Sequence, residues 1–313
     1  MLEITPITTA TAEIAQRIQR CLATSGMLAH HRRCYEDARL VTLADVQELL
    51  AQSALTTWLL RADDEVQGFA ITTIVNRSDA RMGQLHFFVA HPAADHHAAE
   101  MLLTRLQQYW SDERVTAIRQ ARLDPISGIF RGEQDRALLA LFAARGFVVG
   151  EVAGNMEIDA RAFGWTEASQ ARADVLHARG ITIRPANATD ARGISALNHA
   201  EDLALWDYHL QATTVFERMH VAVHVGRIVG YANFFAARWD TDLPEFGPLL
   251  VASEHRKAGL GRVLTERALQ YARIHGKQRV RLSTLRPTFA FYRALGFEVT
   301  VTWQEQLWKE LRD

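Results

Sequence analysis

The chain has 313 residues, of which 48% are hydrophobic and 23% are charged, and its formal net charge is -1. This length accommodates two ordinary domains, and the composition is typical of a globular protein that buries a core. The near-neutral charge gives no electrostatic reason to expect nucleic acid or an anionic membrane as a partner.

The N-terminal segment shows neither a targeting signal nor a disulfide pattern. Its first residues, MLEITPITTATAEIAQ, lack a basic stretch followed by an apolar run, so we expect no signal peptide. Cys21 and Cys34 are too few for a disulfide framework and form no CxxC motif. No apolar run reaches the roughly eighteen residues of a membrane span. We therefore expect a cytoplasmic protein. The sequence does not decide between a monomer and a homodimer.

The first half contains a strand that ends in Phe-Phe-Val-Ala, followed by an amphipathic helix. Ala98, Leu102, Leu106 and Tyr109 recur at intervals that line one face of a 3.6-residue period. Histidines and an aspartate cluster just before and at the start of this helix: His91, Asp95, His96 and His97. Adjacent ligands diverge at a helix start, and no i, i+4 pair lies beside a third ligand, so we predict no metal site.

A polar stretch from Thr166 to Gly180 connects the two halves. It is predicted to be a helix that ends at Arg179-Gly180, because glycine after a basic residue commonly stops a helix.

The second half alternates strands and helices around a mixed sheet. The predicted order is a strand (181–186), two helical regions that reach Met219, a hairpin (220–236), a strand (246–251), a helix (259–275), a strand (279–283), a helix (288–295) and a closing strand (297–303).

The middle sections of the two halves repeat one another at a constant offset of 162 residues. The matched positions are Gly68 with Gly230, Phe69 with Tyr231, Val89 with Val251, and Ala98 with Leu260.

A second match lies near the end of each half. LFAARGF (141–147) corresponds to FYRALGF (291–297) at an offset of 150. We interpret the repeat as a tandem duplication with a first domain at 1–160, a linker helix at 161–180 and a second domain at 181–313. The predicted fold class is α/β with an α+β mixed sheet in each of the two domains.

The segment from Leu249 to Arg262 is the most informative one. A strand ends, a turn carries Arg256-x-x-Gly259-x-Gly261, and a helix begins. Glycines at a helix start let backbone N–H groups approach an anion, and the helix dipole adds positive potential there. Arg256, Lys257 and Arg262 add three formal cations. This pattern favours a pyrophosphate ligand.

This segment resembles the Arg/Gln-x-x-Gly-x-Gly/Ala signature of the Gcn5-related N-acetyltransferase family. Residues 291–297 are similar to a second landmark of that family, Phe/Leu-Tyr-x-x-x-Gly-Phe. The resemblance implies acetyl-CoA as co-substrate, with its pantetheine arm added like a strand and its pyrophosphate held by loop amides. The residues it implies in donor binding are Leu249, Leu250, Val251, Arg256, Lys257, Ala258, Gly259, Leu260, Gly261 and Arg262.

The resemblance also assigns two catalytic candidates. Tyr292 matches the family's tyrosine that approaches the coenzyme A sulfur and protonates the leaving thiolate; the alternative is a core aromatic residue. Glu245 has the spacing of a general base in several members; the alternative is a solvated carboxylate at a strand end, and Asp240 and Asp242 are rivals. Many members carry an asparagine where this chain has Leu285, which weakens a second contact to the donor arm.

The first copy departs from the signature. The replacements are Ala94 for Arg256, Asp95 for Lys257, His97 for Gly259, Glu100 for Arg262 and Phe142 for Tyr292. Carboxylates and a bulky side chain oppose phosphate binding, so we predict that the first copy has lost it.

The acceptor is expected to be the amine of a small molecule or an amino-acid-like compound. The segment Glu201 to His209 falls where the family builds its acceptor pocket, and Trp239-Asp240 is a weaker candidate; both are equally compatible with plain packing. Alternative functions are a protein or peptide N-acetyltransferase, a non-catalytic acyl-CoA sensor, and a transferase that uses aminoacyl-tRNA, which normally needs a basic groove.

Overall fold

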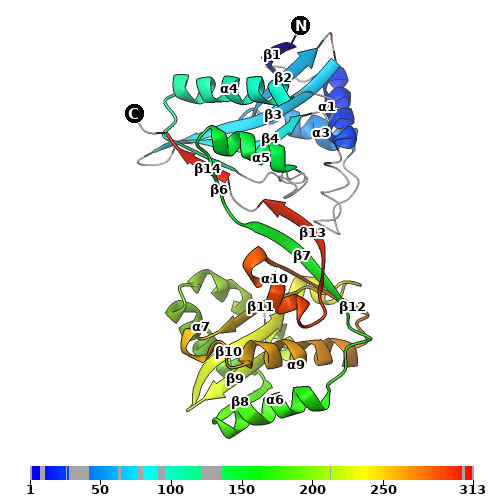
Figure 1. Cartoon of the computed structure of the whole chain (residues 1–313), viewed down its shortest axis with the longest axis vertical. Coiled ribbons are helices and arrows are strands. Elements are labelled where there is room, and N and C mark those ends of the chain that lie inside the picture. Colours follow the sequence, from blue (N-terminus) through cyan, green and yellow to red (C-terminus); the bar gives the residue numbers. More distant parts are fainter. Residues whose placement is uncertain are drawn as a thin grey trace. The chain divides into compact units, whose positions relative to one another are not determined.

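The computed structural model divides the chain into two compact units, each with its own sheet and core (Figure 1). The structure describes residues 2–7, 11–25, 27, 42–62, 65–76, 80–90, 96–120, 135–211, 213–304 and 307–311. The first unit comprises Met1–Gly154 with Val301–Asp313, and the second comprises Asn155–Thr300. The fold is mixed α/β, as predicted.

The first unit is built on a seven-stranded sheet with the order β1-β2-β3-β4-β5-β14-β6. Its pairs are antiparallel except for β4 with β5, which run parallel. The strands are β1 (Leu2–Ile7), β2 (Thr56–Ala62), β3 (Glu65–Asn76), β4 (Arg81–Ala90), β5 (Ala117–Gln120), β6 (Val148–Val149) and β14 (Leu307–Glu310).

Helices pack against this sheet to form two separate cores. Helices α1 (Ala12–Thr24) and α3 (Leu43–Leu50) cover one core, which contains Phe87 and Val89 of β4. Helices α4 (His96–Asp112) and α5 (Arg136–Ala144) cover the other, which contains Phe88. Since successive side chains of a strand point to opposite faces, neighbouring residues of β4 serve different cores.

The second unit contains a four-stranded antiparallel sheet with the order β11-β10-β9-β8. The strands are β8 (Ile181–Pro185), β9 (His220–His224), β10 (Arg227–Phe234) and β11 (Phe246–Val251). The predicted hairpin is confirmed: β9 and β10 are joined by Val225 and Gly226, with φ of 49° and 72°. Two positive φ values match the turn that suits the strand twist of a two-residue hairpin.

Helices of the second unit pack on this sheet. Helix α9 (Leu260–Ile274) contacts β9, β10 and β11, and α7 (Ala191–Ala200) contacts β10. Helix α6 (Glu167–Ala178) packs on β8 and α9, so the predicted connecting helix belongs to this unit's core, where Leu176 is buried. It ends at Arg179 and Gly180 as predicted, and Gly180 has a φ of 78°.

Short helices complete the second unit. They are α8 (Ala236–Trp239), α10 (Phe289–Arg293) and 3₁₀ turns at Ala188–Asp190, Ala204–Gln211, Thr213–Arg218, Ser253–His255 and Arg286–Thr288. The predicted second helical region before Met219 is therefore 3₁₀ in character. None of the helices in the described part of the chain is both long and apolar enough to cross a membrane.

Each half of the chain supplies a strand to the sheet of the other half. A three-stranded sheet has the order β12-β7-β13, with β7 (Val152–Asp159) between β12 (Arg279–Leu285) and β13 (Glu298–Gln304). In the first unit, β14 from the end of the chain lies between β5 and β6. The compact units therefore group residues 301–313 with the first half, whereas the repeat predicts that they belong to the second domain.

The strand ladders correct one detail of the repeat. Gly230 pairs with Val251, but Gly68 pairs with Ala90 rather than with Val89. Both β3 and β10 contain register shifts, at different points, so the predicted match of Val89 with Val251 is wrong by one residue.

Candidate functional site

Strand β11 separates from β12 after a single point of contact. Its partner on one side is β10, and on the other side an isolated parallel bridge joins Glu245 to Arg281. The Arg281 amide also donates to the Pro244 carbonyl at 3.0 Å. Within the described residues β11 is therefore an edge strand beyond Glu245, and the backbone side that faces away from β10 is open to another extended chain.

The residues that face this open side follow from the backbone alternation. The Ala252 amide donates to the Val229 carbonyl at 2.9 Å, so the backbone of Ala252 faces β10. Successive residues of a strand direct their backbone polar groups to opposite sides. The amides of Val251 and Leu249 therefore face the open side. The backbone polar groups of Leu250 face β10, and its side chain is buried in the core.

The loop after β11 has a backbone that requires glycine. Gly259 is the N-cap of α9 with a φ of 85°, and Lys257 also has a positive φ of 63°. A Cβ atom at Gly259 would meet nothing within 4 Å, so the left-handed backbone rather than crowding demands glycine, and the space over it is open. The first amides of the 15-residue helix α9 have no intrahelical acceptor, which makes this end attractive to an anion.

Arg256 serves as a tie inside the loop. Its guanidinium forms an ion pair with Glu201, and its Nε donates to the Val251 carbonyl at 3.0 Å. Glu201 also accepts hydrogen bonds from the Ser253 amide and hydroxyl, both at 2.7 Å. These Ser253 hydrogen bonds, with the charge of Arg256, lower the pKa of Glu201. The charge of Arg256 is thus largely compensated within the protein.

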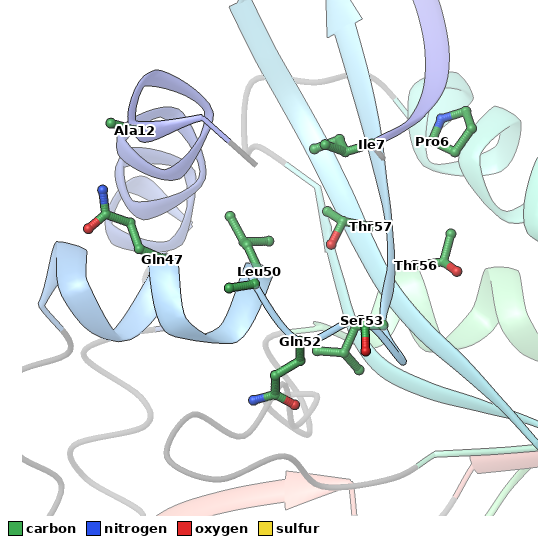
Figure 2. Close-up of a pocket in the computed structure, with 11 residues that line it drawn as sticks. Pro6, Ile7, Ala12, Gln47, Leu50, Gln52, Ser53, Thr56 and Thr57 are labelled. Carbon is green, nitrogen blue, oxygen red and sulfur yellow. The ribbon is translucent and has the colours of Figure 1, made fainter. Parts of the chain in front are cut away.

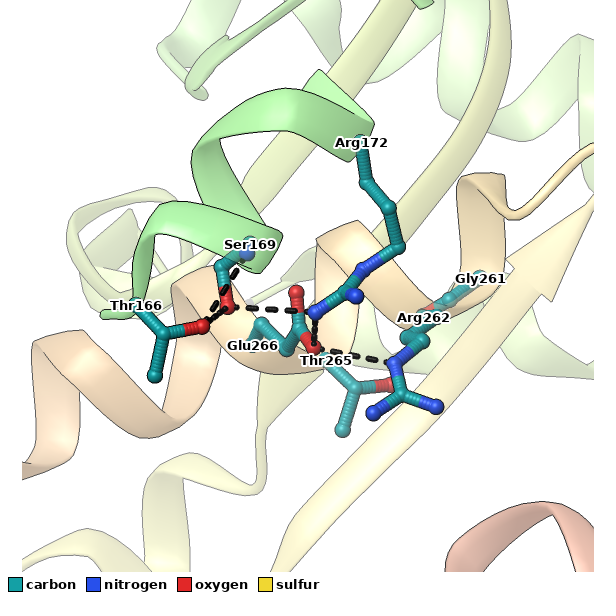
Figure 3. Close-up of polar contacts among 7 residues, drawn as sticks. All are labelled: Thr166, Ser169, Arg172, Gly261, Arg262, Thr265 and Glu266. Atoms are coloured by element: carbon teal, nitrogen blue, oxygen red, sulfur yellow. Dashed lines mark hydrogen bonds and ion pairs between the residues drawn. The ribbon is translucent and has the colours of Figure 1, made fainter. Parts of the chain in front are cut away.

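Arg262 and Lys257 differ in their surroundings. Arg262 Nε donates to Glu266 at 3.0 Å, and Arg172 of α6 donates to the same carboxylate oxygen at 2.6 Å (Figure 3). Lys257 is exposed and forms no ion pair within the described residues. Of the three predicted cations, only Lys257 lacks a carboxylate partner in that part of the chain.

The two sequence landmarks meet at the start of α9. A Cβ atom at Gly261 would lie 3.6 Å from the Val251 side chain and 3.7 Å from the Phe291 ring. Helix α10, which carries Phe291 and Tyr292, therefore lies against both the end of β11 and the glycine loop. The structure brings the glycine loop and Phe291, the residue before the predicted tyrosine, together.

Tyr292 is a buried side chain with an unused hydroxyl. It is 8% exposed and packs against Phe291 and Phe297, with ring centroids 4.9 and 5.7 Å apart. Its hydroxyl forms no hydrogen bond within the described residues, and burial raises the pKa of Tyr292, so the group keeps its proton at neutral pH.

Glu245 lies at the point where β11 and β12 part. It is half-buried, and Ser283 of β12 approaches its carboxylate at 3.5 Å. The rival Asp242 is exposed in the preceding turn, and Asp240 is the C-cap of α8. Leu285, where an asparagine is common in the family, is 43% exposed at the end of β12.

The segment from Glu201 to His209 is held by a polar network that sequence reasoning missed. Asp207 accepts hydrogen bonds from Ser195 at 2.5 Å and from Asn198 at 2.8 Å, and Asn198 accepts one from the buried Tyr231 at 2.7 Å. These hydrogen bonds, that from Ser195 first, lower the pKa of Asp207. Since Glu201 is tied to the loop, both carboxylates are engaged internally. The side chains of Tyr208 and His209 lie outside the described residues.

Trp239 belongs to the packing of the second unit. Its ring contacts Phe234 and Tyr271, with Arg218 and Lys277 at 5.4 and 5.0 Å from its centroid. It is 7% exposed, which favours the packing interpretation over an acceptor contact.

The corresponding positions of the first unit have other roles. Ala94, Asp95 and His91 lie outside the described residues, as does the side chain of His96; His97 is exposed on α4. Glu100 pairs with Arg145 at 2.5 Å, and Phe142 is fully buried against Phe88 and Phe147. The described residues contain no group of three side chains suited to a metal ion. Burial raises the pKa of the Cys21 thiol to about 12, and Cys34 lies outside the described residues.

A pocket of about 750 Å³ lies in the first unit, beside α3 and the ends of β1 and β2 (Figure 2). None of its lining residues is charged or was predicted as a site residue: Pro6, Ile7, Ala12, Gln47, Leu50, Ala51, Gln52, Ser53, Leu55, Thr56 and Thr57. It is separate from the predicted site, all of whose residues belong to the second unit.

Comparison with solved structures identifies similar folds. A GCN5-related glucosamine N-acetyltransferase region of a fungal multi-domain GH3 β-N-acetylglucosaminidase superposes with a TM-score of 0.57 at 14% identity, over 98% of this chain and 38% of that chain. This chain therefore spans well under half of that protein. A GCN5-related N-acetyltransferase from Sphaerobacter thermophilus gives a TM-score of 0.55 at 16% identity, over 99% and 96% of the two chains. At these identities the similarity concerns the fold.

Comparison with sequences is more specific. No curated protein sequence matches the chain. Residues 189–297 match the model of the acetyltransferase (GNAT) family, and this range contains both the glycine loop and the α10 landmark. Residues 189–297 of the chain therefore form a domain of the acetyltransferase (GNAT) family.

Proposed function

We propose that the chain is an acetyl-CoA-dependent N-acetyltransferase whose second domain, residues 181–313, binds the donor and catalyses transfer to the amine of a small molecule or amino-acid-like acceptor. The first domain (1–160) has lost donor binding in this proposal, and residues 161–180 form the connection. The observation that carries the proposal is the open edge of β11 running directly into the left-handed Gly259 loop at the start of α9.

This arrangement fits the two ends of coenzyme A. The outward backbone groups of Leu249 and the outward amide of Val251 offer an edge to which the amides of a pantetheine arm can pair like a strand, while the Val251 carbonyl already accepts from Arg256 Nε. The amides from Gly259 to Arg262 offer unpaired donors to a pyrophosphate, with Lys257 as an adjacent exposed cation. Coenzyme A supplies the acetyl group as a thioester, which an amine can attack.

Glu245 is proposed as the base that accepts a proton from the acceptor amine. An alkyl amine with an ordinary pKa is neutral in about one molecule in 2,500 at pH 7, which corresponds to roughly 4.6 kcal/mol. A carboxylate at the parting of β11 and β12 can take that proton directly or through a water molecule. Asp240 and Asp242 lie nearby in the chain and add negative potential that attracts a cationic amine.

Tyr292 is proposed as the acid that protonates the departing sulfur. Its raised pKa keeps the hydroxyl protonated until a thiolate, a strong acceptor in a buried site, develops beside it. The Val251 amide faces the open side of β11 and can stabilise a negative carbonyl oxygen there. Leu250 contributes through its buried side chain, which holds the strand against the core.

The proposal is tested in two steps on the full chain. Acetyl-CoA should raise the melting temperature, and free thiol should then appear when small amines are offered. Stabilisation without thiol release on any amine would favour an acyl-CoA sensor, and release with peptides alone would favour a protein acceptor. A chain whose melting temperature does not respond to acetyl-CoA would refute the donor site.

A further inference from the structure

We propose that Arg172 and Glu266 are positioning residues that present Arg262 to a phosphate group of the donor. This inference rests on the proposed function, because it specifies how the same donor site obtains part of its positive charge. It concerns side chains 94 residues apart in the sequence, one on α6 and two on α9.

The two arginine side chains converge on one carboxylate oxygen of Glu266 (Figure 3). Oε1 of Glu266 accepts from Arg262 Nε at 3.0 Å and from Arg172 Nη2 at 2.6 Å. Glu266 is 2% exposed, while the side chains of Arg172 and Arg262 are 33% and 38% exposed. The carboxylate is therefore an internal anchor, and both guanidinium groups reach it from the partly solvated side.

The charge balance of this triad depends on Arg172. A pair of Glu266 and Arg262 alone would be neutral, and Arg262 would add little to an anion site. With Arg172 the triad has a net charge of +1, which spans the first two turns of α9. Within the described residues Arg262 uses only Nε, which donates to Glu266, so its two terminal nitrogens remain available as a fork for phosphate oxygens.

The start of α6 holds Arg172 in place. Arg172 Nη2 also donates to the Ser169 hydroxyl at 3.2 Å, and the Ser169 amide donates to Thr166 Oγ1, the N-cap of the helix, at 3.1 Å. Ser169 is 2% exposed. The capped end of α6 therefore fixes the guanidinium group of Arg172. Arg172 in turn holds the Glu266 carboxylate, and this carboxylate orients Arg262.

Arg172→Gln in the full chain tests this inference. It removes one positive charge far from the thioester, so the dissociation constant of coenzyme A should rise about tenfold while kcat at saturating acetyl-CoA stays within about twofold. With S-acetyl-pantetheine, which has no nucleotide phosphates, kcat/KM should match that of the wild type. Acetyl-dephospho-CoA, which lacks the 3′-phosphate, distinguishes the phosphates. If Arg172→Gln weakens its binding as much as that of acetyl-CoA, Arg262 contacts the pyrophosphate; if Arg172→Gln leaves its binding unchanged, Arg262 contacts the 3′-phosphate.

Three further variants keep the test decisive if one of them folds poorly. Arg172→Lys should restore most of the affinity for coenzyme A, and adding Arg172→Gln to Arg262→Gln should cause no further loss, because both act through one group. Asp174→Asn, on the exposed side of α6 where it contacts Gln170, is the matched control and should bind coenzyme A like the wild type.

Two outcomes overturn the inference. One is an equal loss with S-acetyl-pantetheine and acetyl-CoA, which indicates a merely structural role. The other is an unchanged dissociation constant in both Arg172→Gln and Arg262→Gln. A wild-type chain that fails to bind coenzyme A refutes the proposed function itself and is recognised before any variant is made.

Discussion

The two units place equivalent residues on one framework and give them different chemistry. Trp58 of β2 pairs with Ala70 and contacts Tyr109 of α4, with ring centroids 4.9 Å apart. His220 of β9 pairs with Ala232 and contacts Tyr271 of α9 at 6.1 Å. Each residue of the first set lies 162 positions before its counterpart in the second set, which is the offset of the repeat. The helix therefore packs on the sheet in the same way in the two units.

The aromatic pair after the last helix makes the same comparison at the candidate site. Phe142 and Phe147 have centroids 5.0 Å apart at 78°, and Tyr292 and Phe297 have centroids 5.7 Å apart at 73°. The framework therefore requires a ring at this position but not a hydroxyl. The Tyr292 hydroxyl forms no hydrogen bond within the described residues and is not among their fully buried unpaired polar atoms, so it stays within reach of a molecule from solvent. Packing alone does not call for this hydroxyl, because a phenylalanine fills the same position in the first unit.

The largest effect is expected for Tyr292→Phe, which gives the second unit the residue of the first. Loss of the proton donor should lower kcat about 100-fold while the dissociation constant of coenzyme A stays nearly unchanged. Steady-state thiol release and calorimetric binding measure the two quantities. Tyr271→Phe, which removes a hydroxyl elsewhere in the same unit, is the control. An unchanged kcat in Tyr292→Phe would remove Tyr292 from the mechanism.

The parts of this site that the sequence predicts are those formed by residues close together in the chain. The glycine loop, helix α9, the hairpin and the second landmark are local patterns, and the structure confirms these elements because local backbone geometry selects their residues. The ion pairs of Glu201 with Arg256 and of Glu266 with Arg172 were missed because these partners lie 55 and 94 residues apart, where no spacing rule applies. The i, i+4 pair of Arg262 with Glu266, in contrast, has a spacing that the sequence shows. The exchange of β7 and β14 was missed because alternation in a strand predicts a strand but not its neighbour.

The two units also differ at His220, which stands where the first unit has Trp58, and this difference should affect stability in acid. Burial lowers the pKa of His220 from 6.5 to about 4, with the charge of Arg267 as a further cause. The unfolded chain therefore binds a proton between pH 6.5 and 4 that the folded chain does not, so the free energy of unfolding falls as the pH falls through this window. From pH 7 to pH 5 this one group should cost about 2 kcal/mol.

His220→Trp, the residue of the first unit, should remove that loss, and His220→Phe is the alternative if tryptophan packs poorly. The measurement is urea unfolding of the wild type and the variants at pH 7 and pH 5. If the wild type and both variants lose the same free energy over this range, then His220 does not titrate abnormally and the comparison fails at this position.

A third prediction copies the first unit's His97 into the loop. Gly259→His should weaken coenzyme A binding about tenfold, because a side chain enters the space over the loop and a left-handed backbone becomes strained. Gly276→His is a matched control: Gly276 has a φ of 76°, a Cβ there would also meet nothing within 4 Å, and it lies after the opposite end of α9. If both variants lose the same stability but only Gly259→His binds coenzyme A more weakly, the anion lies at Gly259. If both variants bind coenzyme A equally well, this loop does not hold the anion.

The smallest effect is expected at Glu201, which ties the end of α7 to the loop of the second unit. Glu201→Gln keeps one acceptor for Ser253 but loses the ion pair with Arg256, so the loop should become less ordered. Because the Arg256 side chain is 51% exposed, the loss of stability should stay below about 1 kcal/mol.

Coenzyme A affinity of Glu201→Gln, measured by calorimetry, should fall about threefold, which corresponds to about 0.7 kcal/mol. Asp202→Asn, the adjacent change, should leave the affinity unaltered. Tighter binding by Glu201→Gln would mean that Glu201 competes with the donor for Arg256, and the tie would then oppose donor binding rather than support it.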